Sequence, residues 1–224
     1  MKIQEFDNKT QLEIALVSKL TELIQLAILK YGEARVLLSG GSSPKTIYAQ
    51  LSEEKLDWTK VKIGLVDERF VELQDKDNNE RMIRSTLCQN KAKKVELVGM
   101  VVDPSNLQHN LELTRDNYRT FEERIDICLL GMGEDGHTAS LFPGDEQSEK
   151  LLTTNELGVF NTISPNYPFN RITCSKEMLA KSENTLLLLA GEKKKEVFEN
   201  ATHSSLPISY VMKEFNNLAV YYSN

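Results

Sequence analysis

The sequence lacks the features that hold many small or exported proteins together. Its 224 residues include only three cysteines, and Cys88, Cys128 and Cys174 form no CxxC pair. A chain of this length buries roughly 70% of its unfolded surface, so its core needs no disulfide or metal. So few cysteines are typical of a reducing compartment, and we therefore expect a cytoplasmic protein.

Long apolar runs are absent as well. The strongest one, Leu186 to Ala190, is far shorter than the roughly 20 residues that cross a bilayer. The opening residues, MKIQEFDNKTQ, contain no apolar core of the kind found in export signals. We therefore predict no association with membranes.

An excess of basic residues is the third absence. The chain has 33 acidic and 27 basic residues and a net charge of −6, whereas non-specific nucleic-acid binding needs a basic surface. No nucleic-acid partner is expected, although an anionic small molecule could still bind a local group of Arg, Lys and backbone N–H groups. The three histidines show no HxH or HxxxH spacing, so no metal site is expected.

What is present is the composition of an ordinary globular protein, 40% hydrophobic and 27% charged, with no repeat or long linker. We expect one domain over residues 1–224. Helix-like patterns cover residues 10–30, 44–51, 79–87, 106–124, 175–181 and 209–215, and another helix starts at 193–195. Strand-like runs cover residues 35–38, 61–66, 125–130, 159–163, 171–174, 185–190 and 218–222. This alternation predicts an α/β fold with a mostly parallel sheet and helices on both faces. The loosest regions are expected at 72–78 and 145–155.

Four of the strand-like runs end in residues unsuited to a core. These ends read SGGSSP (39–44), DER (67–69), GMGEDGH (131–137) and GEKKK (191–195). Because the carboxyl ends of parallel strands lie on one edge of a sheet, we expect the four segments to converge there.

The SGGSSP segment offers small residues whose backbone N–H groups can approach an anion at a helix start. Ser43 suits the N-cap of that helix and Pro44 its first position. The segment lacks the GK[ST] ending of a nucleotide-binding P-loop. A plain strand-to-helix turn explains it equally well.

The segment from Gly131 to Gly136 formally matches the GxGxxG pattern of dinucleotide-binding proteins. That pattern should open a full helix, and the next strand should end in an acidic residue. Here Pro143 and Gly144 end the segment early, and Glu156 precedes the next strand-like run. The context therefore argues against NAD or FAD.

His137 follows this turn, and histidine can move protons near neutral pH. Asp135 could orient or polarise its ring, and Thr138 and Ser140 could cap the next turn. A histidine in this place can also simply cap a helix. The other two histidines, His109 and His203, lie in polar stretches and are expected to be exposed bystanders.

Three basic residues beside the expected edge could bind a phosphate or carboxylate: Arg69, Arg171 and Lys194. The alternative for each is an ordinary solvated charge. Of the three lysines at 193–195, only one is expected to point inward.

Together these segments resemble a known family, the 6-phosphogluconolactonases, which hydrolyse a lactone in the oxidative pentose phosphate pathway. The matching segments are LSGGSSP (38–44), VDERFV (66–71), NNERMIRSTL (78–87), LLGMGEDGHTASLFPG (129–144), RIT (171–173), GEKK (191–194) and LPIS (206–209). They span nearly the whole chain in order, and GMGxDGHTASLFPG is highly specific. Two departures are visible: Asn78-Asn79-Glu80 stands where Ser-Asn-Tyr is common, and 72–77 lacks a frequent proline.

The resemblance implies a Rossmann-like fold and hydrolysis of 6-phospho-D-glucono-1,5-lactone without a cofactor. It implies that His137 is the general base and that Asp135 supports it. The substrate-binding residues that it implies are Gly40, Gly41, Ser42, Asp67, Arg69, Asn79, Arg171 and Lys194. A monomer or weak homo-oligomer is expected. The alternatives are a deaminase or isomerase of glucosamine-6-phosphate and a non-catalytic sugar-phosphate sensor.

Overall fold

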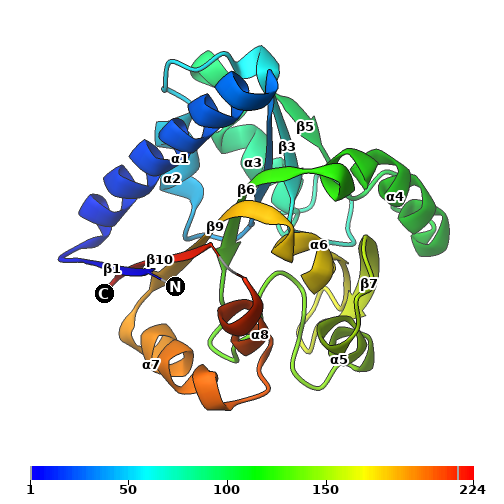
Figure 1. Cartoon of the computed structure of the whole chain (residues 1–224). Coiled ribbons are helices and arrows are strands. Elements are labelled where there is room, and N and C mark those ends of the chain that lie inside the picture. The colour runs from blue at the N-terminus through cyan, green and yellow to red at the C-terminus, as the bar shows by residue number, and fades with distance from the viewer. Residues whose placement is uncertain (1, 216) are drawn as a thin grey trace.

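The computed structural model describes residues 2–215 and 217–224, which form two β-sheets (Figure 1). The larger sheet is parallel throughout, in the order β1 (Lys2–Phe6), β10 (Leu218–Ser223), β9 (Ser182–Ala190), β6 (Ile125–Gly131), β2 (Ala34–Leu38), β3 (Val61–Leu65) and β5 (Glu96–Val98). The smaller sheet is antiparallel, in the order β4 (Asp67–Arg69), β8 (Asn170–Cys174) and β7 (Val159–Ile163).

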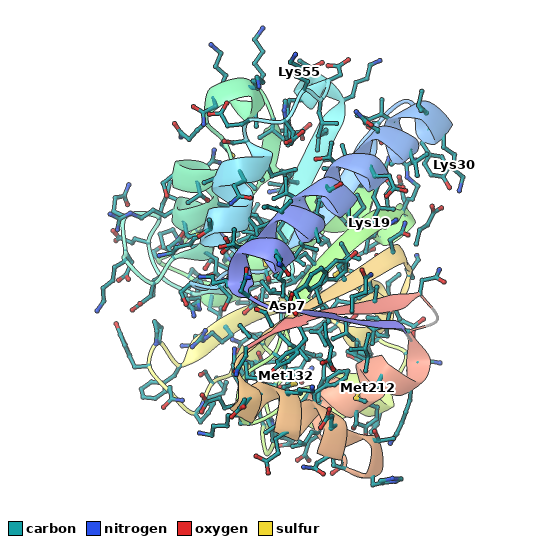
Figure 2. The ribbon with its side chains drawn as sticks, turned by 90° about the vertical axis from the view of Figure 1, so that its left-hand side faces the viewer. Asp7, Lys19, Lys30, Lys55, Met132 and Met212 are labelled. Atoms are coloured by element: carbon teal, nitrogen blue, oxygen red, sulfur yellow. The ribbon has the colours of Figure 1, made fainter. Side chains whose placement is uncertain are left out.

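Helices cover both faces of the large sheet, as the alternating pattern predicts. They are α1 (Lys9–Tyr31), α2 (Lys45–Leu51), α3 (Asn79–Thr86), α4 (Leu107–Glu123), α5 (Glu146–Thr153), α6 (Lys176–Ala180), α7 (Glu192–Asn200) and α8 (Pro207–Glu214). Figure 1 shows α1 and α2 on one side of the strands and α7 and α8 on the other. In Figure 2, α1 crosses one face from Asp7 to Lys30, while Met212 marks α8 beyond the strands.

The core forms because the central strands are apolar on both faces, as parallel strands between two helical layers must be. Six of the seven residues of β6 are buried, and the stretch from Thr185 to Leu189 in β9 is buried beside it. On α1 the predicted apolar stripe, Leu12, Leu16, Leu20, Leu23, Ile24 and Ala27, faces this core. Each fully buried aliphatic side chain contributes about 1.5–3 kcal/mol to folding.

Several elements differ from the sequence-based expectation. The segment 145–155 is not loose: α5 forms there, because Asp145 accepts a hydrogen bond from the N–H of Ser148 at 2.8 Å and Leu151 and Leu152 are buried. The edge strands β1 and β5 were not predicted. Pro44, not Ser43, precedes the first residue of α2, and no side chain caps that helix.

The DER segment also differs from the expectation that it merely ends β3. Its residues leave the large sheet and pair as β4 with β8, so that Arg69 lies opposite Arg171. The carboxyl ends of β2, β3, β6 and β9 are in register, with Leu38 beside both Leu65 and Leu129, and Gly131 beside Leu188. The loops that follow these strands therefore meet at one edge, as expected.

None of the described helices combines the length and the apolarity that a membrane span requires.

Candidate active site

A cavity of about 250 Å³ opens at this edge of the large sheet. Its walls come from the turn after β2, from β4 and α3, from the loop after β6, and from β9 and the first turn of α7. The lining residues are Ser39, Gly40, Gly41, Ser42, Ser43, Pro44, Asp67, Arg69, Asn79, Gly131, Met132, Gly133, His137, Ala139, Leu188 and Lys194. Segments far apart in the sequence thus converge on one small polar cavity.

The loop after β6 begins at Met132, labelled in Figure 2, and folds back on itself. The N–H of Gly133 donates to the carbonyl of His137 at 2.9 Å, and the hydroxyl of Thr138 donates to the carbonyl of Gly131. An added Cβ on Gly133 would lie 2.2 Å from the His137 ring. Only glycine allows the backbone to come this close to the ring. Gly133 therefore lets the loop hold the His137 ring against the cavity.

His137 and Asp135 form a close pair in this loop. The ring Nδ1 lies 2.5 Å from Oδ1 of Asp135, and the same oxygen accepts the backbone N–H of His137 at 3.1 Å. Burial would raise the pKa of Asp135, but the hydrogen bond and charge of His137 outweigh it, and the pKa falls below its ordinary value. An ionised Asp135 can accept a hydrogen bond from a proton carried on Nδ1 of His137.

The turn after β2 (39–43), which we call the anion-binding turn, lines the cavity. The N–H of Ser39 donates to Leu129, whereas those of Gly40, Gly41 and Ser42 have no partner within the described part of the chain. Unpaired N–H groups in a concave turn are suited to binding an anion.

Two arginines lie side by side on the smaller sheet. Nη1 of Arg69 donates to the carbonyl of Asp77 at 2.6 Å, and Arg69 lines the cavity. Arg171 is 7% exposed and does not line it: its Nε donates to the carbonyl of Pro168 and its Nη2 to the hydroxyl of Ser164. Burial and the charge of Arg69 lower the pKa of Arg171. Among the residues described, neither arginine pairs with a carboxylate.

The three lysines that begin α7 have different surroundings, and only Lys194 lines the cavity. Lys193 forms an ion pair with Glu134, in the loop that carries His137. Lys195 bonds to Glu5 at 2.9 Å. The structure thus distinguishes three residues that the sequence left equivalent.

Asp67 and Asn79 complete the wall beside Arg69. Oδ2 of Asp67 accepts the hydroxyl of Ser140 at 2.5 Å. The amide of Asn79 donates to the backbone carbonyl of Asp67 at 3.1 Å. Its Oδ1 lies against Gly40, where an added Cβ would come within 1.9 Å. The anion-binding turn and α3 are therefore in direct contact.

Eight of the ten residues singled out in the sequence line this cavity, and two lie behind it: Asp135 contacts His137, and Arg171 lies beside Arg69. His109 and His203 are exposed, as expected. Thr138 and Ser140 cap no helix, because their hydroxyls bond to Gly131 and Asp67. The apolar wall residue Leu188 was missed, since a leucine inside a strand carries no polar signal.

No group of three His, Cys, Asp or Glu side chains suited to a metal occurs in residues 2–215 and 217–224. The polar groups at the cavity include His137, which contacts Asp135, together with Asp67, Arg69 and Lys194.

Comparison with known proteins places the chain in a family. Residues 7–220 match the family model described as glucosamine-6-phosphate isomerases/6-phosphogluconolactonase. A 6-phosphogluconolactonase of Pseudomonas aeruginosa is 32% identical over 80% of this chain and 76% of its own length. One from Neisseria meningitidis is 30% identical over 98% of this chain and 97% of its own.

Solved structures agree. A 6-phosphogluconolactonase from Shewanella baltica superimposes with a TM-score of 0.94 at 34% identity, covering 100% of this chain and 98% of that one. A monomeric glucosamine-6-phosphate deaminase has a TM-score of 0.81 at 17% identity, over 100% of this chain and 98% of its own, which shows a shared fold alone.

Proposed function

Because this chain belongs to the family of glucosamine-6-phosphate isomerases and 6-phosphogluconolactonases, we propose that it uses His137 to hydrolyse 6-phospho-D-glucono-1,5-lactone. Within the family it is a lactone hydrolase, as its relatives indicate. The product is 6-phospho-D-gluconate. We place the reaction in the oxidative pentose phosphate pathway and in the cytoplasm, in a single functional domain.

The observation that carries the mechanism is the orientation of His137. Its Nδ1 faces Asp135 at 2.5 Å, and its ring lines the cavity. Nε2 is therefore the nitrogen available to take a proton from water. The hydroxide attacks C1 of the lactone, the carbonyl π bond opens to an oxyanion, and the C1–O5 bond breaks as the carbonyl re-forms. The proton on Nε2 then passes to O5, so that the histidine is regenerated.

The groups that bind the substrate are assigned from their charge and their hydrogen-bond donors. We assign the phosphate to Arg69, Lys194 and the N–H groups of the anion-binding turn, because they line the same cavity and carry donors without carboxylate partners among the residues described. Nη1 of Arg171 is a further donor beside Arg69, and Asp67 and Asn79 offer oxygen and amide groups to sugar hydroxyls. Fixing the phosphate holds C1 near His137, which lowers the entropic cost of the reaction.

The test is His137→Ala assayed with freshly made lactone and corrected for spontaneous hydrolysis. Loss of a general base predicts a fall in kcat of about 10²- to 10⁴-fold. His109→Ala, which removes an exposed histidine on α4, is the matched control and should retain activity. A His137→Ala enzyme with near-normal kcat would contradict the assignment.

The same preparation distinguishes the alternatives. Release of ammonia from glucosamine-6-phosphate would indicate a deaminase. Binding of 6-phosphogluconate without any turnover of the lactone would indicate a sensor. We expect no ammonia, because the relatives with 30% identity or more are lactonases, and we expect turnover, because the histidine–aspartate pair is intact beside the cavity.

A further inference from the structure

Glu68 is a buried acidic residue that the mechanism above does not use. It is 0% exposed and does not line the cavity, although its neighbours Asp67 and Arg69 both do. Side chains alternate across a strand, so Glu68 in the middle of β4 points away from the cavity. A carboxyl group in such a place requires hydrogen-bond partners.

Within the described part of the chain, the hydrogen-bond partners of the Glu68 carboxyl group are all backbone N–H groups. Oε1 accepts the N–H of Arg69 and the N–H of Asn79, each at 2.7 Å. Oε2 accepts the N–H of Glu80, also at 2.7 Å. One carboxyl group thus joins β4 to the first turn of α3, where helix N–H groups have no intrahelical acceptor.

The two segments that Glu68 joins are separated in sequence by a surface loop. Residues 70–78 connect Arg69 to Asn79, and the stretch from Glu72 to Gln74 is exposed. Within this loop the side chain of Arg69 bonds only to the carbonyl of Asp77. Without Glu68, the side-chain bonds from Arg69 to the carbonyl of Asp77 and from Asn79 to the carbonyl of Asp67 would remain, but the N–H groups that begin α3 would lose their acceptor on β4.

The joined residues in turn define the cavity wall. The Asn79 amide bonds to the carbonyl of Asp67 and lies against Gly40 of the anion-binding turn. A shift of the first turn of α3 would therefore displace the groups assigned to the phosphate and the sugar. Among the described residues, the side chain of His137 bonds to Asp135, on the loop after β6, and not to Glu68 or to these segments.

We propose that Glu68 is a positioning residue, which holds Arg69 and Asn79 at the spacing that substrate binding requires. The inference rests on the proposed function and extends it to a residue that never touches the substrate. Because Glu68 acts on the binding wall and not on the base, its loss raises KM more than it lowers kcat.

The test uses two variants. Glu68→Ala removes all three acceptors. Glu68→Gln keeps the Oε1 acceptor and turns an NH2 group toward the N–H of Glu80, so it is the milder change and remains informative if Glu68→Ala does not fold. We expect KM for the lactone, and Kd for 6-phosphogluconate by calorimetry, to rise about 10-fold or more in Glu68→Ala. Glu68→Gln should show a smaller rise, with kcat less affected in both.

Asn110→Ala is the matched control. Asn110 is also buried, accepts the N–H groups of Val102 and Asp103, and fixes a loop that does not line the cavity. It should lower Tm comparably while leaving KM unchanged. If the Glu68 variants lose stability as Asn110→Ala does and keep a wild-type KM, Glu68 is structural only and the proposal is wrong.

A double-variant cycle and hydrogen exchange complete the test. The effect of Glu68→Gln on Kd should largely vanish in an Arg69→Ala/Asn79→Ala background, and an undiminished effect there would overturn the proposal.

Hydrogen–deuterium exchange needs no ligand: Glu68→Ala should speed exchange at residues 69–80 and not at 132–140. Unchanged exchange at 69–80 would also overturn it. A wild-type protein without lactonase activity would instead refute the proposed function, and the exchange result would still decide the role of Glu68 in holding the segment.

Discussion

Lys193 and Lys194 are adjacent in the sequence but have different surroundings. Lys194 lines the cavity, whereas Lys193 forms an ion pair with Glu134. A charge-assisted bond to phosphate predicts that Lys194→Ala raises KM about 10- to 100-fold with a smaller change in kcat. Lys193→Ala is the matched control, and because exposed ion pairs contribute little, its KM should stay within about twofold of wild type. Equal effects of the two variants on steady-state kinetics would contradict the assignment.

Glu68 also makes stability depend on pH. Burial raises its pKa to about 8 and the charge of Asp67 adds to this, while the three backbone donors oppose it. The folded protein therefore keeps a proton that the unfolded chain has already released. The stability contributed by this group is complete below about pH 4.5 and is lost as pH rises to about 8.

The measurement is the free energy of unfolding of the wild type and of Glu68→Gln, by denaturant titration from pH 5 to pH 9. The difference, wild type minus variant, should decline up to about pH 8 and then level off. A difference that stays constant over this range would show that Glu68 is ionised throughout, because neither the folded nor the unfolded state would then gain or lose a proton there.

At the scale of elements, the backbone of the loop after β6 fixes the position of His137, the proposed general base. At position 133 only glycine fits against the His137 ring, because an added Cβ would lie 2.2 Å from the ring. Gly133→Ala should displace the ring, and since a displacement of about 1 Å can cost 10²-fold in rate, kcat should fall by that order. At Gly131 an added Cβ meets nothing within 4 Å. Gly131→Ala should therefore have a far smaller effect in the same assay, and equal losses would argue against the steric explanation.

The elements themselves were predictable where the apolar pattern was long. The stripe on α1 and the apolar runs of β6 and β9 predict helix and strands correctly, because burial decides both. β5 has only three residues, and α5 depends on Asp145 and on a small cluster with Leu141. Such elements form through tertiary contacts, which a local pattern does not contain.

At the scale of the whole molecule, ligand binding should be visible as stability. A ligand at 100 times its Kd stabilises the folded state by about 2.7 kcal/mol, which for a chain of this size raises Tm by roughly 5–10 °C. We expect such a shift with 6-phosphogluconate in thermal unfolding, and little or none with unphosphorylated gluconate at the same concentration. Equal shifts would show that the cavity does not recognise the phosphate.

The sequence by itself determined the fold class, the family and most of the residues at the cavity. Strand runs of buried residues, each followed by glycine or charge, require a parallel sheet with loops meeting at one edge. The specific segment around His137 marked the family. These features depend on residue type and order, and they are present before the chain folds.

The side chains that line the cavity, and the residues that each of them contacts, follow from the tertiary structure. It separated Lys194 from Lys193 and Lys195, placed Arg171 behind Arg69, and paired the DER segment with β8. It also showed that Glu68, from that same segment, points away from the cavity and joins β4 to α3. The direction of a side chain depends on strand pairing and on packing between distant segments, which no local sequence pattern specifies.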